Sequence, residues 1–475
     1  MGKPNMIKNY IYNMLYEVLA LAIPLITTPY ISRVLGATAI GDYGFTSGIV
    51  SYFTIFAALG TVNYAKREIA YNQHDKYARS KLFYEIFIFR LLTTLIATIA
   101  FIVFIQFTPS NLREIYIIQI LTLIAWALDI SWFFQGMEDF KIIAIRNSIV
   151  KIVGTVCIFI FVKDSEDLWK YTVILCLSNL IGNMYTWIGL NKYLVKVKTT
   201  VKEIFQHTRG ILALFATVVA IQVYTILDQT MIGIFANNTE VGYYAQAQKI
   251  VKIALMVISS FTAVLMPRIA NLYGNKDTQE IKKHLNKSVE FIMILAIPMM
   301  VGCACVSGRF VPIFFGAGYD KVSDLLAILS ILFVVLGCGQ LFGTLLVSLK
   351  LQRDYTISVC LGAVCNFILN IFLIQNYWSI GAAVASVIAE SVVTIRNFYI
   401  LNRQYSFVGS LSKALIRYGI SSISIIAVTS IFQAFVENSV ITLCVEVILA
   451  VVSYFIILLL QRDKFIFELL RKIRK

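Results

Sequence analysis

Long apolar stretches alternate with short polar segments along the chain, and this alternation predicts membrane-spanning helices. A helix needs about 20 apolar residues to cross a bilayer, and charge-poor segments of that length recur fourteen times. The first is not a removable signal, because its apolar run continues through Ala20-Leu21-Ala22 to Ile31. We predict spans near 9–32, 40–65, 82–107, 114–134, 142–162, 168–191, 210–236, 241–266, 286–306, 322–349, 355–375, 377–401, 411–435 and 438–460.

The basic residues fall almost entirely on one set of connections. If the N-terminus lies inside, the inside segments hold 31 Lys and Arg residues and the outside segments hold six. Lys and Arg collect on the cytoplasmic side of membrane proteins. We therefore expect both termini in the cytoplasm and an even number of spans. The excess of positive charge, +15, then serves topology and does not indicate nucleic-acid binding.

The first twelve spans look like two copies of one six-helix unit. Gly41 follows span 1 and Gly242 follows span 7, 201 residues later, and Arg67 and Arg268 share that offset. Because six is even, both copies face the same way, as in a parallel repeat about an axis along the membrane normal. The predicted parts are an N-lobe at 1–200, a C-lobe at 201–405, and spans 13 and 14 with a basic cytoplasmic tail at 406–475.

Composition narrows the class of protein further. Hydrophobic residues make up 59% of the 475 residues and charged residues 14%, against roughly 25% charged in soluble domains. This excludes a soluble multidomain fold. The eight cysteines lie in apolar segments without C-x-x-C spacing, and the three histidines lie near loops. The sequence therefore predicts no metal site.

Ionisable residues inside spans are costly, so they mark functional sites by default. Five cations lie within spans or at a span end, and we expect them to face a water-filled cavity that suits an anionic substrate such as phosphate or diphosphate. Pairing with buried acids is the competing interpretation. Three acids could also bind a coupling proton or sodium ion. The cations are Arg33, Arg90, Lys151, Lys249 and Lys252, and the acids are Asp129, Asp228 and Glu390.

The sequence lacks the signatures of an enzyme. It has no phosphate-binding Gly-x-x-x-x-Gly-Lys-Ser/Thr segment and no metal cluster, and its outer loops are short. We therefore expect no catalysis and no cofactor. A sugar-transfer enzyme is disfavoured, because such a site normally needs a substantial outer loop.

Two stretches of sequence, the fourteen predicted spans and the repeat together resemble a known family. The two stretches are Pro29-Tyr30-Ile31-Ser32-Arg33-Val34-Leu35-Gly36, leading to Gly41-Asp42-Tyr43-Gly44, and Asp228-Gln229-Thr230-Met231-Ile232-Gly233, leading to Val241-Gly242-Tyr243-Tyr244. The chain resembles the polysaccharide flippases, the Wzx-like repeat-unit translocases of the multidrug/oligosaccharidyl-lipid/polysaccharide exporter superfamily. Arg33 is the one candidate cation within a stretch that looks typical of the family.

The resemblance implies a fold and an activity. The fold is an all-α integral membrane protein with two six-helix lobes in a V around a central cavity, plus two C-terminal helices. The activity is the movement of undecaprenyl-diphosphate-linked oligosaccharides to the outer leaflet of the bacterial inner membrane, for capsule, O-antigen or exopolysaccharide. Membrane lipids, a polysaccharide polymerase and glycosyltransferases are the partners implied. We expect the lipid tail in the bilayer or along spans 13 and 14. A cation-coupled exporter of small drugs on the same scaffold remains the alternative.

Overall fold

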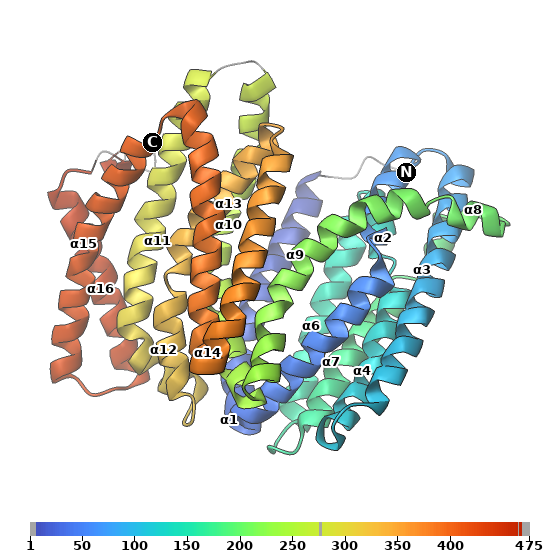
Figure 1. The fold of residues 1–475 in the computed structure, drawn as a ribbon, viewed down its shortest axis with the longest axis horizontal. Coiled ribbons are helices and arrows are strands. Elements are labelled where there is room, and N and C mark those ends of the chain that lie inside the picture. Colours follow the sequence, from blue (N-terminus) through green and yellow to red (C-terminus); the bar gives the residue numbers. More distant parts are fainter. Residues whose placement is uncertain (1–5, 275–277, 464, 468–475) are drawn as a thin grey trace. The chain divides into compact units, whose positions relative to one another are not determined.

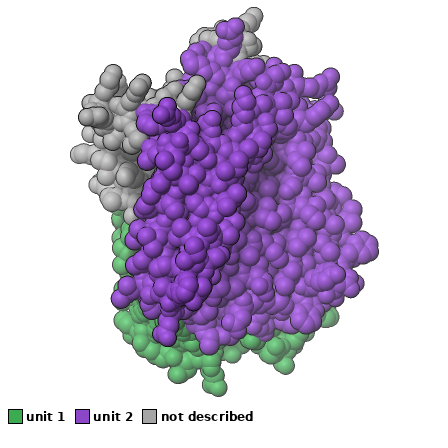
Figure 2. Space-filling view, turned by 90° about the vertical axis from the view of Figure 1, so that its left-hand side faces the viewer, with its two compact units in different colours: residues 1–230 green, residues 231–475 purple. Residues whose placement is uncertain are grey.

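The computed structural model describes residues 6–274, 278–463 and 465–467, and no strand occurs in those ranges (Figure 1). The chain forms two compact units, residues 1–230 (unit 1) and 231–475 (unit 2), which Figure 2 shows in different colours. The all-helical fold class is therefore confirmed for the part of the chain that the structure describes.

Unit 1 is built around α1, which contacts α3, α4 and α6, while α4 and α6 both pack on α7. Short helices and a linker at residues 186–207 complete one end of it. The elements are α1 (Met6–Ala58), α2 (Thr61–Tyr71), α3 (Lys76–Gln106), α4 (Ser110–Leu128), α5 (Ser131–Gly136), α6 (Phe140–Phe161), α7 (Leu168–Tyr185), η1 (Leu190–Lys192), α8 (Val201–Phe205) and most of α9 (Thr208–Phe235).

Helix α1 is two spans joined at a glycine. Gly36 has φ 77° and ψ 171°, a backbone conformation that glycine adopts without the steric cost other residues incur. The helix therefore breaks between the predicted spans at 9–32 and 40–65. The gap between these two predicted spans, residues 33–39, located this break correctly.

One end of unit 1, which we call the inner end, brings together three connections that the sequence places on the same side. Arg79 donates to the Tyr193 carbonyl, the Val195 N–H donates to Ser80 Oγ at 2.9 Å, and Tyr193 donates to Asp139 at 2.8 Å. Burial and the bond to Asp139 raise the pKa of Tyr193 to about 12. Which side of the membrane this end faces stays a prediction.

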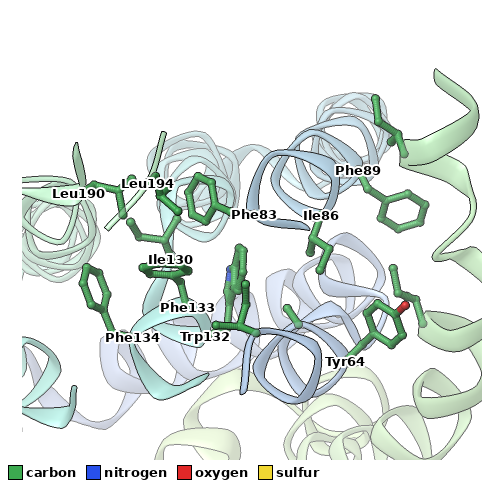
Figure 3. Close-up of a cluster of buried hydrophobic side chains, with 14 residues drawn as sticks. Tyr64, Phe83, Ile86, Phe89, Ile130, Trp132, Phe133, Phe134, Leu190 and Leu194 are labelled. Atoms are coloured by element: carbon green, nitrogen blue, oxygen red, sulfur yellow. The ribbon is translucent and has the colours of Figure 1, made fainter. Parts of the chain in front are cut away.

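An aromatic core underlies the inner end (Figure 3). Trp132 and Phe133 of α5 are fully buried against Phe83 of α3. Leu190 and Leu194 bring the linker into the same cluster. Burying a large apolar side chain contributes roughly 1.5–3 kcal/mol, so the linker is held on unit 1 by packing as well as by hydrogen bonds.

Unit 2 packs α11 on α15, α13 on α14, and α15 on α16, while α10 contacts α12 and α13. Its helix α14 again contains two predicted spans, with a break at Trp378, which has φ 54° and ψ −129°. The elements are the end of α9, α10 (Asn238–Gly274), α11 (Thr278–Phe315), α12 (Asp320–Leu329), α13 (Leu332–Ser348), α14 (Gln352–Tyr405), α15 (Val408–Phe435) and α16 (Val440–Leu460).

Each of the fourteen predicted spans falls on a helix or a broken helix. By length and hydropathy, nine helices of the described ranges could cross a membrane, or ten if α12 and α13 form one bent span. Two of the nine contain the breaks at Gly36 and Trp378. The division between the two units falls inside α9 and says nothing of the repeat, so the predicted parts at 1–200, 201–405 and 406–475 stay predictions.

Candidate functional site

A buried cation lies on helix α3 of unit 1, within the predicted span at 82–107. Arg90 is 0% exposed on α3, and its Nη2 donates to the Trp126 carbonyl oxygen at 2.7 Å. The same nitrogen lies 3.7 Å from Asp129 Oδ2. A buried charge is tolerated when it is paired and hydrogen-bonded. In this conformation Arg90 therefore makes the acid pairing that the sequence left open as the alternative to a cavity-facing position.

Asp129 joins two arginines. It ends α4 and accepts hydrogen bonds from the Ser131 N–H at 3.0 Å and the Ser131 hydroxyl at 2.6 Å. Its Oδ1 also lies 3.4 Å from Arg146 Nη1. Two guanidinium groups and one carboxylate leave one positive charge in excess. The cluster thus has the sign of charge that a phosphate-bearing ligand requires.

Arg146 is a member that the sequence analysis did not single out. It lies on α6, donates to Asn183 Oδ1 of α7 at 2.8 Å and is bonded to Asn147. Arg146 lies near the start of the predicted span at 142–162, so it counts among the 31 basic residues of the inside segments. Its position within the apolar run at 142–162, five residues before Lys151, was the available signal.

The other predicted cations are distributed over both units. Arg33 is exposed on α1, three residues before the break at Gly36, and Lys151 is partly buried on α6. Lys249 and Lys252 lie one turn apart on α10 in unit 2, the first partly buried and the second exposed. Of the five, the structure brings Arg90 together with a predicted acid.

The two remaining acids lie on different helices. Asp228 is buried on α9, two residues before Thr230, whose hydroxyl accepts a 3.2 Å hydrogen bond from Tyr52 of α1. Glu390 is partly buried on α14. No group of three or more His, Cys, Asp or Glu side chains suited to a metal occurs among the residues that the structure describes.

Unit 2 contains an apolar cavity of about 420 Å³. Helix α11 forms one wall with Pro298, Gly302 and Phe310, and α16 forms another with Ala450 and Tyr454. Helices α10, α12 and α15 also reach it. Its walls are almost entirely hydrocarbon, so it suits an apolar chain and not a sugar or a phosphate.

A polar network connects three of the helices that line this cavity, α11, α15 and α16. Arg309 of α11 donates to the Gln433 carbonyl of α15 at 2.9 Å and lies 3.4 Å from Glu446 of α16, which is fully buried. Gln433 also donates to Glu446 at 2.6 Å. The bonds hold α15 and α16 against α11, so they maintain the cavity.

Comparison with known proteins gives the family. The model of the family described as "Polysaccharide biosynthesis protein" matches residues 6–273, more than half of the chain. The chain belongs to this family. The MatE family model matches a second region, residues 213–372.

Relatives of this chain include transporters and flippases. A "Putative O-antigen transporter" from Escherichia coli strain K12 is 22% identical over 83% of this chain and 96% of that protein. The "Probable low-salt glycan biosynthesis flippase Agl15" from Haloferax volcanii is 26% identical over 45% of this chain and 47% of that protein. These names are those of transporters, not of enzymes.

The family member also shares its fold with solved membrane transporters. The lipid II flippase MurJ in an inward closed conformation aligns over 96% of this chain and 99% of its own, with a TM-score of 0.74 and 16% identity. An inward-facing multidrug resistance MATE transporter of the MOP superfamily aligns over 82% of this chain and 99% of its own, with a TM-score of 0.57 and 14% identity. The predicted resemblance to the polysaccharide flippases of this superfamily is confirmed.

Proposed function

We propose that this chain flips undecaprenyl-diphosphate-linked oligosaccharides from the cytoplasmic to the outer leaflet by alternating access, for capsule, O-antigen or exopolysaccharide synthesis. The observation that carries the proposal is the family match over residues 6–273. Relatives named for O-antigen transport and glycan flipping support it. The charges and the cavity described above supply the chemistry that such a substrate needs.

The diphosphate headgroup needs cations in a wet environment, because burying one unpaired ion costs several kcal/mol. Arg33, Lys151, Lys249 and Lys252 remain our candidates for this role. Arg90 joins them through the cluster with Asp129 and Arg146, which carries one excess positive charge. Several weak contacts suit transport better than one tight site, since the substrate must also leave.

The lipid tail needs an apolar path. The 420 Å³ cavity in unit 2 offers one, because α11, α15 and α16 line it with hydrocarbon. Helices α15 and α16 are the predicted spans 13 and 14. A polyprenyl chain lying there would keep contact with protein while its headgroup crosses, and this assigns a role to the two helices outside the repeat.

Two sources of energy could drive the transport cycle of this protein. A proton or sodium ion could bind at Asp129, Asp228 or Glu390, of which Asp129 has arginine neighbours. Alternatively, polymerisation outside pulls the substrate across without coupling. Transport that persists in vesicles after the ion gradients are collapsed would exclude coupling.

Orientation and partners complete the proposal. We expect a bacterial inner-membrane protein with both termini in the cytoplasm, working beside glycosyltransferases and a polymerase. A cysteine introduced at Asp164 should react with an impermeant reagent in intact cells, whereas one at Lys198 should not. Labelling at Lys198 in sealed cells would overturn this orientation.

Deletion of the gene in its own host tests the function. We expect loss of surface polysaccharide together with accumulation of the lipid-linked precursor inside. Loss of both would place the protein in synthesis instead. Normal export in the deletion strain would contradict the proposal.

A second candidate is a cation-coupled exporter of small drugs. The MatE match at residues 213–372 and the fold shared with a MATE transporter favour it. Drug exporters bind cationic compounds through acids, whereas most of the ionisable candidates here are basic. Increased drug sensitivity of the deletion strain with unchanged polysaccharide would select this alternative.

A further inference from the structure

Three buried polar side chains meet at the inner end of unit 1, where the substrate chemistry proposed above gives them no role. Tyr64 lies on α2, Glu85 on α3, and His207 directly before α9. They are 8%, 2% and 7% exposed. Ionisable groups that are buried this deeply usually have a function or form part of a structural network.

The three side chains form one continuous chain of hydrogen bonds. His207 Nε2 lies 2.7 Å from Glu85 Oε2, and His207 Nδ1 lies 2.9 Å from the Tyr64 hydroxyl. The imidazole therefore bridges Tyr64 of α2 and Glu85 of α3 through its two ring nitrogens. Gln206 donates a further bond to Glu85 at 3.3 Å.

The inner end of α9 meets its neighbours at glycines. A Cβ at Gly210 would lie 2.5 Å from Tyr64 Cε2, and a Cβ at Gly60 would lie 3.0 Å from the Phe215 nitrogen. Glycine contributes no side-chain packing of its own. Ile211 of α9 is buried in the aromatic core described above, and the polar chain through His207 adds a directional attachment to this packing.

Helix α9 is shared between the two compact units. The division falls between Thr230 and Met231, inside a helix that runs from Thr208 to Phe235. Any change in the arrangement of the units must therefore be taken up by α9, through bending or through movement of its inner end. A contact that fixes the inner end controls this movement.

We propose that Tyr64, Glu85 and His207 form a latch that fixes the inner end of α9 in one state of the transport cycle and opens in the other. They are positioning residues that act through α9 and not on the substrate. The inference rests on the alternating-access transport proposed above.

The environment of the latch suits a contact that opens. Glu85 Oε1 is buried and has no hydrogen-bond partner among the residues that the structure describes. When the latch opens, water can hydrogen-bond to this oxygen, and this offsets part of the free-energy cost of breaking the other hydrogen bonds. The neighbouring Lys81–Glu203 ion pair holds α8 on α3 and is about one-third exposed, so it constrains the linker only weakly.

Reversible cross-linking tests the latch. In a variant whose eight native cysteines are replaced, Glu85→Cys and His207→Cys are joined by a short bis-thiosulfonate reagent that a reductant removes. We expect flipping of a fluorescent lipid-diphosphate oligosaccharide in vesicles to stop on cross-linking and to recover on reduction. His207→Cys alone, treated with the same reagent, is the control. Undiminished flipping by fully cross-linked protein would overturn the latch.

Substitution provides a second, independent measurement. Spin labels at Tyr77→Cys in unit 1 and Arg353→Cys in unit 2 report the distance between exposed sites. Glu85→Ala or His207→Ala should shift the ratio of the two distance populations by about tenfold, the scale of one lost buried hydrogen bond. Glu85→Gln keeps an acceptor oxygen and should stay near wild type. Identical populations in all four proteins would contradict the latch.

The outcomes separate the latch from the transport proposal. If the cysteine-replaced parent protein, correctly folded, flips no substrate, then the proposed function fails. If this parent flips substrate and the cross-linked protein flips it equally well, then only the latch fails.

Discussion

The two units bury an arginine beside a carboxylate in different surroundings. In unit 1 Arg90 and Arg146 share Asp129, and the cluster keeps one positive charge in excess. In unit 2 Arg309 pairs with Glu446, and its other bonds end on the carbonyls of Gln433 and Val436. The first cluster carries one excess positive charge, whereas the second is neutral and holds helices around an apolar cavity.

This difference suggests that the two parts of an amphiphilic substrate, its charged headgroup and its apolar tail, bind in chemically different regions of the protein. A diphosphate is attracted to excess cations, and a polyprenyl tail is compatible with a 420 Å³ hydrocarbon-lined space. If the assignment is right, substitutions in the two regions have separable effects on stability and on transport. Predictions at Arg90, Gly302 and Lys249 test how charged and apolar positions contribute to stability and transport, and a fourth concerns a loop outside both regions.

The largest effect is expected at Arg90. Arg90→Ala removes a fully buried side chain and leaves the Trp126 carbonyl without its Arg90 donor, while Asp129 keeps Arg146. It should lower the free energy of unfolding by about 1–3 kcal/mol, the cost of removing one partner of a buried hydrogen bond. Thermal unfolding in detergent measures the change, and Arg33→Ala, at an exposed position, is the matched control. Equal melting temperatures for wild type and Arg90→Ala would show that the pair is not structural.

Filling the unit 2 cavity should change stability and transport in opposite directions. Gly302 lines the cavity, and a Cβ there meets nothing within 4 Å. Gly302→Leu should stabilise α11 by about 1 kcal/mol, because glycine is a poor helix former. It should also reduce flipping roughly tenfold, the factor that corresponds to 1.4 kcal/mol of lost tail binding.

Gly308→Leu is the control for this experiment. Gly308 lies on the same helix, outside the cavity lining, and a Cβ there also meets nothing within 4 Å. Gly308→Leu should stabilise α11 by the same amount and should leave the rate of flipping unchanged. Equal flipping by both leucine variants would remove the cavity from the mechanism.

Lys249 should affect transport and leave stability unchanged. Its ammonium is partly buried on α10, and Lys249→Ala should reduce polysaccharide export about fivefold, the effect of a contact of about 1 kcal/mol. Lys249→Arg should be milder, because a diffuse field does not require one donor geometry. The readout is polysaccharide yield per membrane-inserted protein, and normal export by both Lys249→Ala and Lys252→Ala would make these cations structural.

The smallest effect is an acid-dependent loss of stability in the loop after α6. The backbone N–H of Lys163 and then the Lys170 side chain hold the pKa of Asp167 at about 2. An unfolded Asp titrates near pH 4. The stabilisation is therefore present above about pH 4 and is lost as the pH falls towards about 2. Melting temperatures should fall less between pH 5 and pH 3 for Asp167→Asn than for wild type, and identical slopes would exclude this contribution.

The sequence predicted the helices well because hydropathy alone specifies a span. Even the break at Gly36 lies in the short gap between two predicted spans, residues 33–39. The break at Trp378 was located within two residues, although a tryptophan at positive φ is not expected from sequence preferences. The spans are local properties of the chain, so an isolated sequence suffices for them.

The site could be predicted only in part, because its contacts are not local. Arg90 and Asp129 were both singled out, but no pattern in the sequence pairs residues on different helices. Arg146 was assigned to a connection, since its depth depends on the tilt of α6. His207 and Glu85 are 122 residues apart, and their contact exists because the linker folds back on α3. Pairings of this kind require the structure.

Flipping by the purified protein tests the central claim most directly. The measurement uses vesicles that contain a fluorescent undecaprenyl-diphosphate oligosaccharide from the host, with a membrane-impermeant reductant that bleaches label in the outer leaflet only. We predict that vesicles with folded protein lose the inner-leaflet signal as well, whereas protein-free vesicles retain it. An inner-leaflet signal that stays protected in vesicles with folded protein would contradict the account.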